Sequence, residues 1–233
     1  ENCPRYSGVT ITGVKVTESP DWLKNKLRTV GIRPINNIVD ITNFVLMEIG
    51  QPMHAFDADM IEGGTVVVKK LSEGTMFTTL DGVERKLNGS ELMICNEKEG
   101  KCIAGVFGGQ KSGVTESTTN VFLESAYFNP VSIRKTSKYH GLKTDASFRY
   151  ERGCDPNITV YALKRAALLI KELAGGTISS DIIDVYPIPI ERAKVEINYR
   201  SMFDLMGKEI PVNTIKSILA MLGITIEAES AEA

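Results

Sequence analysis

The side chains best suited to chemistry occur in separated segments that are otherwise largely apolar. Thr42 and Asn43 lie within an apolar pattern of helical spacing. His54 stands between apolar neighbours, and Glu124 lies on an apolar run that alternates like a strand. Thr144 belongs to a polar segment further along the chain. If these groups meet, they form a small pocket with a carboxylate, an imidazole and hydroxyls, which suits a hydroxylated ligand and an oriented water.

The polar segment runs from Tyr139 to Gly153 and carries hydroxyls, phenols, a histidine and alternating charges with few aliphatic side chains. This composition predicts a loop that handles a polar ligand, and a solvated connection between two helices explains it equally well. His140 stands directly before Gly141, which favours a helix end there. His54 is therefore the better functional candidate of the two histidines.

Each candidate residue also has a purely structural interpretation. A lone histidine among apolar residues is more often a hydrogen-bonded core side chain than a catalyst. Thr42 and Asn43 fit the solvated face of a helix. Glu124 fits a charge in water at a sheet edge, whereas a buried Glu124 needs a partner. The spacing in the sequence does not decide between these interpretations.

Composition excludes several classes of function. The chain has 233 residues, 42% of them hydrophobic, and a formal net charge of -2. This near balance argues against a basic protein that wraps nucleic acid, so any RNA contact is expected to be local. No apolar run is long enough to span a bilayer and no export signal begins the sequence, which predicts a soluble, cytoplasmic protein with no membrane partner.

Motifs for metal, nucleotide and nucleophilic chemistry are missing. Only two histidines occur and no HExxH spacing is present, so no metal site is expected. The glycine-rich segment 107–113 lacks the Gly-Lys-Ser/Thr ending of a phosphate loop, and there is no GxSxG elbow. The four cysteines form no CxxC pair. We interpret Cys95 and Cys102 as reduced packing residues on strands, with a bridge across a hairpin as the alternative.

The periodicity predicts an α+β fold. Helical patterns with terminal Pro or Gly signals alternate with short runs of period two. A layered antiparallel or mixed β-sandwich core with flanking helices is therefore expected. The helices are predicted from Pro20 with Ser19 as its cap, and at 38–49, 130–140, 155–174, 202–206 and 212–222. The strands are predicted at 9–16, 65–70, 75–80, 83–87, 92–95, 101–106, 120–125, 178–185, 195–197 and 224–226, with a turn at 51–57.

Proline punctuation divides the chain. The segment Tyr186-Pro187-Ile188-Pro189 interrupts both helices and strands and is predicted to be a linker. Residues 1–189 then form the main domain. Residues 190–233 are too few to bury a core of their own and are predicted to be part of a second domain.

A series of motifs carries a resemblance to a known family. The motifs, in order, are RPINN at 33–37, VDITN at 39–43, GQPMHAFD at 50–57, FGG at 107–109, LESAYFNP at 123–130 and HGLKTDASFRYERG at 140–153. Together they resemble the B3/B4 region of the bacterial phenylalanyl-tRNA synthetase beta subunit, over about Pro4 to Pro187. The chain from about Glu191 resembles the start of the B5 domain of that subunit.

The resemblance implies an editing module that hydrolyses tyrosine wrongly attached to phenylalanine tRNA. It implies that Glu124 accepts the phenolic hydroxyl of the tyrosyl group. His54 would hold the aminoacyl end or the attacking water, and Thr144 would help to place that water. Ala146 would leave room for the amino acid.

The resemblance further implies that Thr42, Asn43 and Gly105 line the pocket, and it leaves the proton acceptor open. The partners it implies are the 3′ end of tRNA(Phe) carrying tyrosine and the synthetase alpha subunit in an α2β2 assembly. No adenylating motif is present, so no cofactor is expected in this chain, and ATP and magnesium belong only to the parent synthetase. The alternative is a non-catalytic fragment that positions tRNA or supports the subunit assembly.

Overall fold

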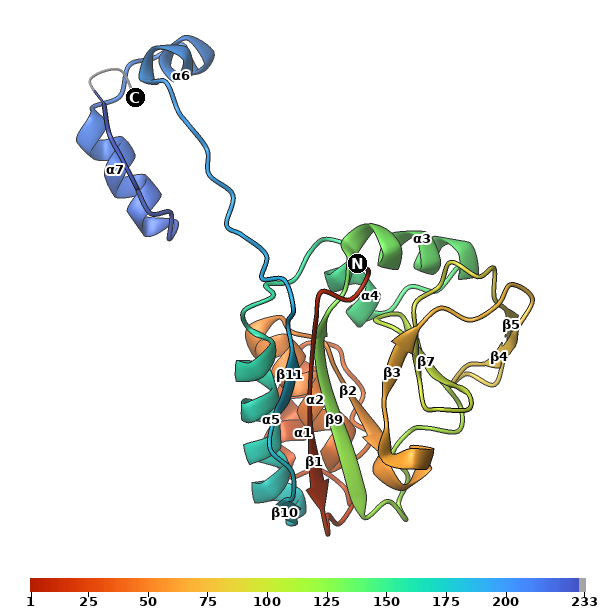
Figure 1. The fold of residues 1–233 in the computed structure, drawn as a ribbon. Coiled ribbons are helices and arrows are strands. Elements are labelled where there is room, and N and C mark those ends of the chain that lie inside the picture. Colours follow the sequence, from red (N-terminus) through yellow and green to blue (C-terminus); the bar gives the residue numbers. More distant parts are fainter. Residues whose placement is uncertain (231–233) are drawn as a thin grey trace. The chain divides into compact units, whose positions relative to one another are not determined.

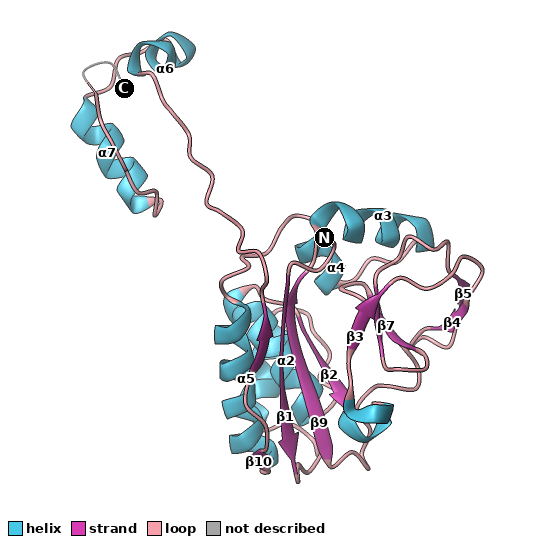
Figure 2. Cartoon of the chain, viewed as in Figure 1, coloured by secondary structure: helices cyan, strands magenta, loops and turns pink. Residues whose placement is uncertain are grey.

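The computed structural model describes residues 1–230, which form two compact units (Figure 1). The first unit is Glu1–Ile190 and the second begins at Glu191. The first unit combines helices with antiparallel sheets (Figure 2), so the predicted α+β fold class is confirmed. In the described part of the chain, no helix has both the length and the apolar character needed to cross a membrane.

A central antiparallel sheet organises the first unit. Its strands follow the order β10 (Thr177–Ile178), β1 (Arg5–Thr12), β9 (Asn120–Tyr127) and β2 (Met53–Asp57), and β11 (Ile183–Val185) also pairs with β1. β9 is hydrogen-bonded on both sides, to β1 and to β2. Because successive side chains point to opposite faces of a strand, this sheet contributes one row of side chains to each of two cores.

Helices cover one face of the central sheet (Figures 1 and 2). They are α1 (Asp21–Thr29), α2 (Asn37–Ile49) and α5 (Thr159–Ala174). The buried apolar side chains on this side are called the helical core, and they include Ile11, Leu23, Ile41, Leu123 and Ile170. The helical spacing of these residues, and the alternation of Ile11 and Leu123 along their strands, explain why the sequence folds this way.

Smaller sheets and helices cover the other face (Figure 1). One sheet has the order β3 (Val67–Lys69), β6 (Met93–Cys95), β7 (Gly100–Ile103) and β8 (Phe107–Gly108), and β4 (Met76–Thr78) pairs with β5 (Glu84–Lys86). Two 3₁₀ turns, Ala58–Met60 and Glu62–Gly64, follow β2, and α3 (Pro130–His140) and α4 (Asp145–Tyr150) follow β9. The buried side chains here are called the sheet core, and they include Phe56, Ile103, Phe128 and Tyr150.

The predicted bounds of two helices are accurate to within one residue. Asn36 accepts hydrogen bonds from the first turn of α2, and Gly50 ends that helix at a φ of 79°. Asn129 caps α3 in the same way, with Pro130 at its first position. The prediction that His140 ends a helix beside Gly141 is confirmed, and the His140 ring pairs with buried Glu91 at 2.9 Å.

Other local predictions were wrong. Ser19 does not cap α1, because its hydroxyl instead donates to the buried carboxylate of Asp40 at 2.6 Å. The segment 51–57 contains strand β2 and is more than a turn. The long helix starts at Thr159, three residues beyond Pro156, because Asp155 forms a turn with Asn157 and Ile158 first.

The polar segment from Tyr139 to Gly153 is mostly helical and is not an extended loop. It contains the end of α3, a short connection and α4. α4 forms because Thr144 and Ser147 make a reciprocal capping box, a signal that the composition of the segment hides.

The second unit contains α6 (Tyr199–Met206) and α7 (Val212–Met221) as predicted. The strands predicted at 195–197 and 224–226 are absent from the described structure, where both segments lack secondary structure. A strand requires a paired neighbour, and the described part of this unit offers none. The B5-like character of this unit remains a prediction.

Candidate functional site

Glu124 lies on β9 and is only 4% exposed. The Tyr6 hydroxyl on β1 donates to its Oε2 at 2.7 Å. Within residues 1–230, no hydrogen bond reaches the other oxygen, Oε1. Burial raises the pKa of Glu124 to about 7, and the Tyr6 hydrogen bond opposes that rise. The interpretation of Glu124 as a sheet-edge charge in water is therefore wrong.

His54 lies on β2 directly opposite Glu124 in the sheet register. Its ring packs edge-on against Phe56, with 4.3 Å between ring centroids. The Nε2 atom is buried and has no hydrogen-bond partner among the described residues. Burial lowers the pKa of His54 to about 4, so the ring is neutral near pH 7. A neutral imidazole with a free nitrogen is available to bind a polar group.

Strand alternation explains why these two side chains share a face. Val121 and Leu123 of β9 point into the helical core. Ala126 belongs to the sheet core, and Phe122 packs against that core. Glu124 shares the parity of the second pair. On β2, Ala55 belongs to the helical core and Phe56 to the sheet core, which places His54 on the sheet-core face. The register of β2 with β9 then brings the carboxyl and the imidazole together.

Thr144 is the N-cap of α4. Its Oγ1 accepts a hydrogen bond from the Ser147 N–H at 3.0 Å and donates to the Val106 carbonyl at 3.0 Å. The Ser147 hydroxyl in turn accepts from the Thr144 N–H at 2.9 Å. Thr144 therefore ties α4 to the turn before β8, and it holds Ala146 of α4 against the sheet core.

Gly105 precedes Val106 in the same turn. Its φ of +65° lies in the left-handed region that favours glycine. A Cβ built there would lie 2.9 Å from atoms of Phe128 and Tyr150 and 3.0 Å from Ile133. Tight packing against α3, α4 and the end of β9 thus explains the glycine.

Thr42 and Asn43 lie on α2, which packs through Ile41 and Val45 into the helical core on the other face of the sheet. Thr42 is buried, so the solvated-face interpretation is wrong for it, and its hydroxyl donates to the Val39 carbonyl at 2.8 Å. Asn43 is half-buried. No hydrogen bond in the described structure links either residue to Glu124 or His54.

Three contributors were missed by sequence reasoning. Tyr6 is 118 residues from Glu124, and no local signal links the two. A Cβ on Gly108 of β8 would lie 3.2 Å from His54 Cε1, so this glycine lets β8 approach the imidazole. Gln51 is fully buried, donates to the Ala126 carbonyl at 2.8 Å and leaves its Oε1 without a partner. Gln51 belongs to the GQPMHAFD motif, which was the available signal.

The geometry thus joins Glu124, His54, Tyr6 and Gly108 on the sheet-core face, with Thr144 and Gly105 meeting at the neighbouring turn. Burial raises the pKa of Tyr6 as well, with Glu124 adding to the shift, which keeps the phenol protonated as a donor. The four cysteines are free thiols. No group of three or more His, Cys, Asp or Glu side chains in residues 1–230 is arranged to hold a metal ion.

Comparison with known proteins identifies the family of this chain. The sequence pattern of the B3/4 domain matches residues 2–175, which is most of the chain. The chain belongs to the B3/4 domain family. The B3/4 domain covers the whole central sheet except β10 and β11, and it includes every candidate site residue.

Similar sequences occur in larger proteins. The phenylalanine–tRNA ligase beta subunit of Bacteroides fragilis (strain ATCC 25285) is 62% identical over 232 residues, which is 100% of this chain and 28% of that protein. The beta subunit of Porphyromonas gingivalis (strain W83) is 52% identical over 97% of this chain and 28% of that protein. The chain therefore spans a little over a quarter of the length of these relatives.

A solved structure also aligns with this chain. It is an N-terminal fragment of the phenylalanyl-tRNA synthetase beta subunit from Pyrococcus horikoshii. The alignment has a TM-score of 0.48 and 13% identity, and covers 97% of this chain and 62% of that one.

Replacement of Gly105 tests whether packing explains this residue. Gly105→Ala should lower the free energy of unfolding by about 2–5 kcal/mol, because left-handed backbone strain adds to overpacking. Gly50→Ala is the matched control, since Gly50 has a similar φ of +79° but open space around its Cβ position. Gly50→Ala should lower the free energy of unfolding by only about 1–2 kcal/mol. Urea denaturation of both variants measures the difference. Equal losses in the two variants would show that the close contacts at Gly105 do not matter.

The raised pKa of Glu124 predicts a specific pH dependence of stability. The folded state holds the Glu124 proton up to about pH 7, whereas the unfolded state releases it near 4.5. The folded state therefore binds more protons in this window, and stability falls as pH rises through it. Relative to Glu124→Gln, the native protein should lose about 3 kcal/mol between pH 4.5 and 7. Urea denaturation of both proteins across this range measures the difference.

Two features keep that measurement interpretable. His54 has a lowered pKa, so its contribution rises with pH between about 4 and 6.5, but it is present in both proteins and cancels in the comparison. Glu48→Gln is the control, because ion pairing with Arg165 lowers the pKa of Glu48 and moves its window below pH 4.5. The Glu48 variant should parallel the native protein from pH 5 to 8. A parallel profile for Glu124→Gln would contradict the buried, raised carboxyl.

Proposed function

We propose that this chain is a proofreading hydrolase that cleaves the ester between tyrosine and tRNA(Phe). The observation that carries the proposal is the carboxyl of Glu124. It is buried, one oxygen already accepts a phenolic hydroxyl from Tyr6 at 2.7 Å, and the other oxygen has no partner among the described residues. The free oxygen can accept the phenolic hydroxyl of a tyrosyl group, in the same way as its neighbour accepts that of Tyr6.

Such a carboxyl discriminates tyrosine from phenylalanine. A bound tyrosine satisfies Glu124 Oε1, whereas a bound phenylalanine leaves a buried acceptor without a partner. Sites built to hydrogen-bond a substrate hydroxyl can reject the analogue without it by about four orders of magnitude. A synthetic pocket shaped for phenylalanine excludes the extra hydroxyl much less strictly, which is why a second site is useful.

The hydrolytic step requires a placed water more than a strong base, because an aminoacyl ester already has an activated carbonyl. His54 is neutral, and its free Nε2 can bind the attacking water or the aminoacyl end. The Thr144 oxygen uses its proton and one lone pair in the cap of α4, which leaves one lone pair to accept from a water. We assign no proton acceptor.

The remaining site residues shape the cavity in this proposal. Ala146 on α4 leaves space for the amino acid. Gly108 lets β8 approach His54, and Gly105 lets the preceding turn pack closely. Thr42 and Asn43 contribute from α2. One turn after Asn43, the Met47 sulfur accepts a hydrogen bond from Arg149 of α4 at 3.0 Å, which links α2 to the helix that carries Ala146.

The relatives support the identity of the substrate. They are phenylalanine–tRNA ligase beta subunits, and identity reaches 62% over this whole chain. We therefore propose tRNA(Phe) as the carrier of the ester and the alpha subunit of such a ligase as a protein partner. ATP and magnesium would serve the parent synthetase and not this chain.

A deacylation assay tests the proposal. The chain should hydrolyse Tyr-tRNA(Phe) much faster than Phe-tRNA(Phe). Glu124→Ala should lower kcat/KM for the tyrosyl ester by about 10- to 200-fold, the equivalent of one hydrogen bond to a charged group. It should raise kcat/KM for the phenylalanyl ester, because the buried acceptor that phenylalanine leaves without a partner is then gone. Ala146→Trp should lower hydrolysis of both esters by filling the amino-acid space.

Glu48→Ala is the matched control, because it removes a carboxylate from an ion pair between α2 and α5, the helices on the face of the sheet opposite to Glu124. It should leave both rates unchanged. Tyrosyl and phenylalanyl esters cleaved at equal rates by the native chain, or a Glu124→Ala variant with native selectivity, would contradict the proposal.

A further inference from the structure

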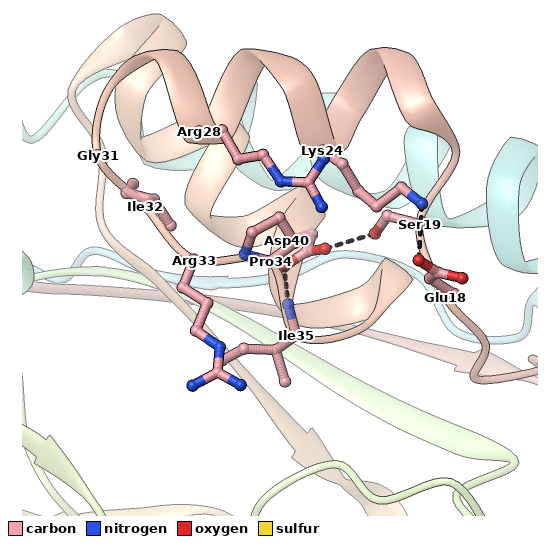
Figure 3. Close-up of a pocket in the computed structure, with 10 residues that line it drawn as sticks. All are labelled: Glu18, Ser19, Lys24, Arg28, Gly31, Ile32, Arg33, Pro34, Ile35 and Asp40. Atoms are coloured by element: carbon pink, nitrogen blue, oxygen red, sulfur yellow. Dashed lines mark hydrogen bonds and ion pairs between the residues drawn. The ribbon is translucent and has the colours of Figure 1, made fainter.

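A cavity of about 440 Å³ lies between the end of α1 and the start of α2 (Figure 3). It adjoins the two helices that pack on the face of the central sheet opposite to Glu124 and His54. None of the candidate hydrolytic-site residues lines it, so it is a separate feature. Its volume is in the range of ligand pockets. The residues that line it and bear on its chemistry are Glu18, Ser19, Lys24, Arg28, Arg33 and Asp40.

The acidic groups of this cavity are already satisfied. Asp40 is fully buried, and its carboxylate accepts from the Ser19 hydroxyl at 2.6 Å and the Ile35 N–H at 2.8 Å. Figure 3 shows both hydrogen bonds beneath Pro34. Glu18 is paired with Lys24 at 2.6 Å. Asp40 therefore holds the connection between the helices in place, and Lys24 contributes little free positive charge.

Two arginines remain uncompensated. Within residues 1–230, neither the Arg28 nor the Arg33 side chain has a hydrogen-bond or ion-pair partner. Arg28 belongs to the last turn of α1, and Arg33 precedes Pro34 in the connection. The connection itself is constrained by Gly31 at a φ of +80° and by the Asp40 hydrogen bond to Ile35. The backbone that carries both guanidinium groups is thus ordered before any ligand arrives.

The arrangement of the two arginines favours a polyanion. Figure 3 shows Arg28 extending over the cavity beside Lys24 and Arg33 extending in a different direction from the other side of Pro34. A single carboxylate is matched by one guanidinium fork, whereas separated forks match successive phosphates of a nucleic-acid backbone. The net charge of -2 makes such a contact local and not a property of the whole surface.

We propose that Arg28 and Arg33 bind backbone phosphates of RNA, forming an electrostatic contact on the helical face of the domain. This proposal rests on the proposed function for the identity of the RNA, which would be the body of tRNA(Phe), while the 3′ end reaches Glu124. Phosphate contacts of this kind position an RNA without reading its sequence. Their affinity depends strongly on salt.

Binding of uncharged tRNA(Phe) by the full chain, measured by fluorescence anisotropy across a salt series, tests the proposal without any ester. Arg28→Ala/Arg33→Ala should weaken binding about tenfold at low salt and reduce the slope of log affinity against log salt by about 2. Lys26→Ala, an exposed cation on the same helix outside the cavity, should change neither quantity. Thermal unfolding of each variant confirms that the fold is retained.

A second arm separates RNA from small phosphates. Pyrophosphate is titrated into the native chain and the double variant by calorimetry. Binding of pyrophosphate that requires the two arginines, combined with unchanged tRNA affinity in the double variant, would overturn the RNA assignment in favour of a small-phosphate site. Native affinity and slope in the double variant, an equal effect of Lys26→Ala, or no tRNA binding by the native chain would also overturn it.

The two proposals fail independently. Retained tRNA binding that depends on Arg28 and Arg33, without hydrolysis of Tyr-tRNA(Phe), would contradict the hydrolase and leave the phosphate contact standing. Selective hydrolysis with native tRNA affinity in the double variant would do the reverse.

Discussion

The burial of one carboxyl group on the central strand β9 is the constraint on which the rest of the site depends. A carboxyl in an apolar layer is costly unless it is protonated or hydrogen-bonded. Glu124 meets this cost in two ways, through a pKa raised to about 7 and through the Tyr6 hydroxyl. The burial and the hydrogen bond both depend on the position of β9 between two paired strands. β1 carries Tyr6, and β2 covers the other side of β9 and carries His54.

The two layers around β9 have different roles. On one face, α1, α2 and α5 pack against the sheet through the apolar side chains of the helical core and support β9. The other face carries the polar groups. There β8 approaches the His54 ring closely at Gly108, and the turn before β8 packs closely against Phe128 and Tyr150 at Gly105. The Thr144 cap joins α4 to that layer through the Val106 carbonyl. A rigid support on one side and closely fitted turns on the other are what a selective site requires.

The same helical layer also presents charge to solvent. The buried Asp40 carboxylate accepts hydrogen bonds from the Ser19 hydroxyl and the Ile35 N–H and forms no ion pair with an arginine. The side chains of Arg28 and Arg33 have no partner within residues 1–230. The connection between α1 and α2 thus links a structural hydrogen-bond network on the inside to a positive surface on the outside.

The sequence alone determined the fold class, most helices and strands, and the family resemblance that selected Glu124, His54 and Thr144, because helix caps, glycine stops and strand alternation are local signals. Its errors were at places where tertiary partners override local preference. Ser19 serves Asp40 instead of a helix, and the polar segment after Tyr139 becomes α4 through a capping box.

Only the tertiary structure decided which candidates meet. Strand register placed His54 opposite Glu124, and the pairing of β1 with β9 brought Tyr6 to a carboxyl 118 residues away. The tertiary structure also showed that Thr42 and Asn43 lie on α2, which packs on the helical-core face of the sheet, and that close packing explains Gly105. Side-chain types and their periods are written along the chain, but a contact between distant segments depends on the sheet register and the packing of layers, which exist only in the folded molecule.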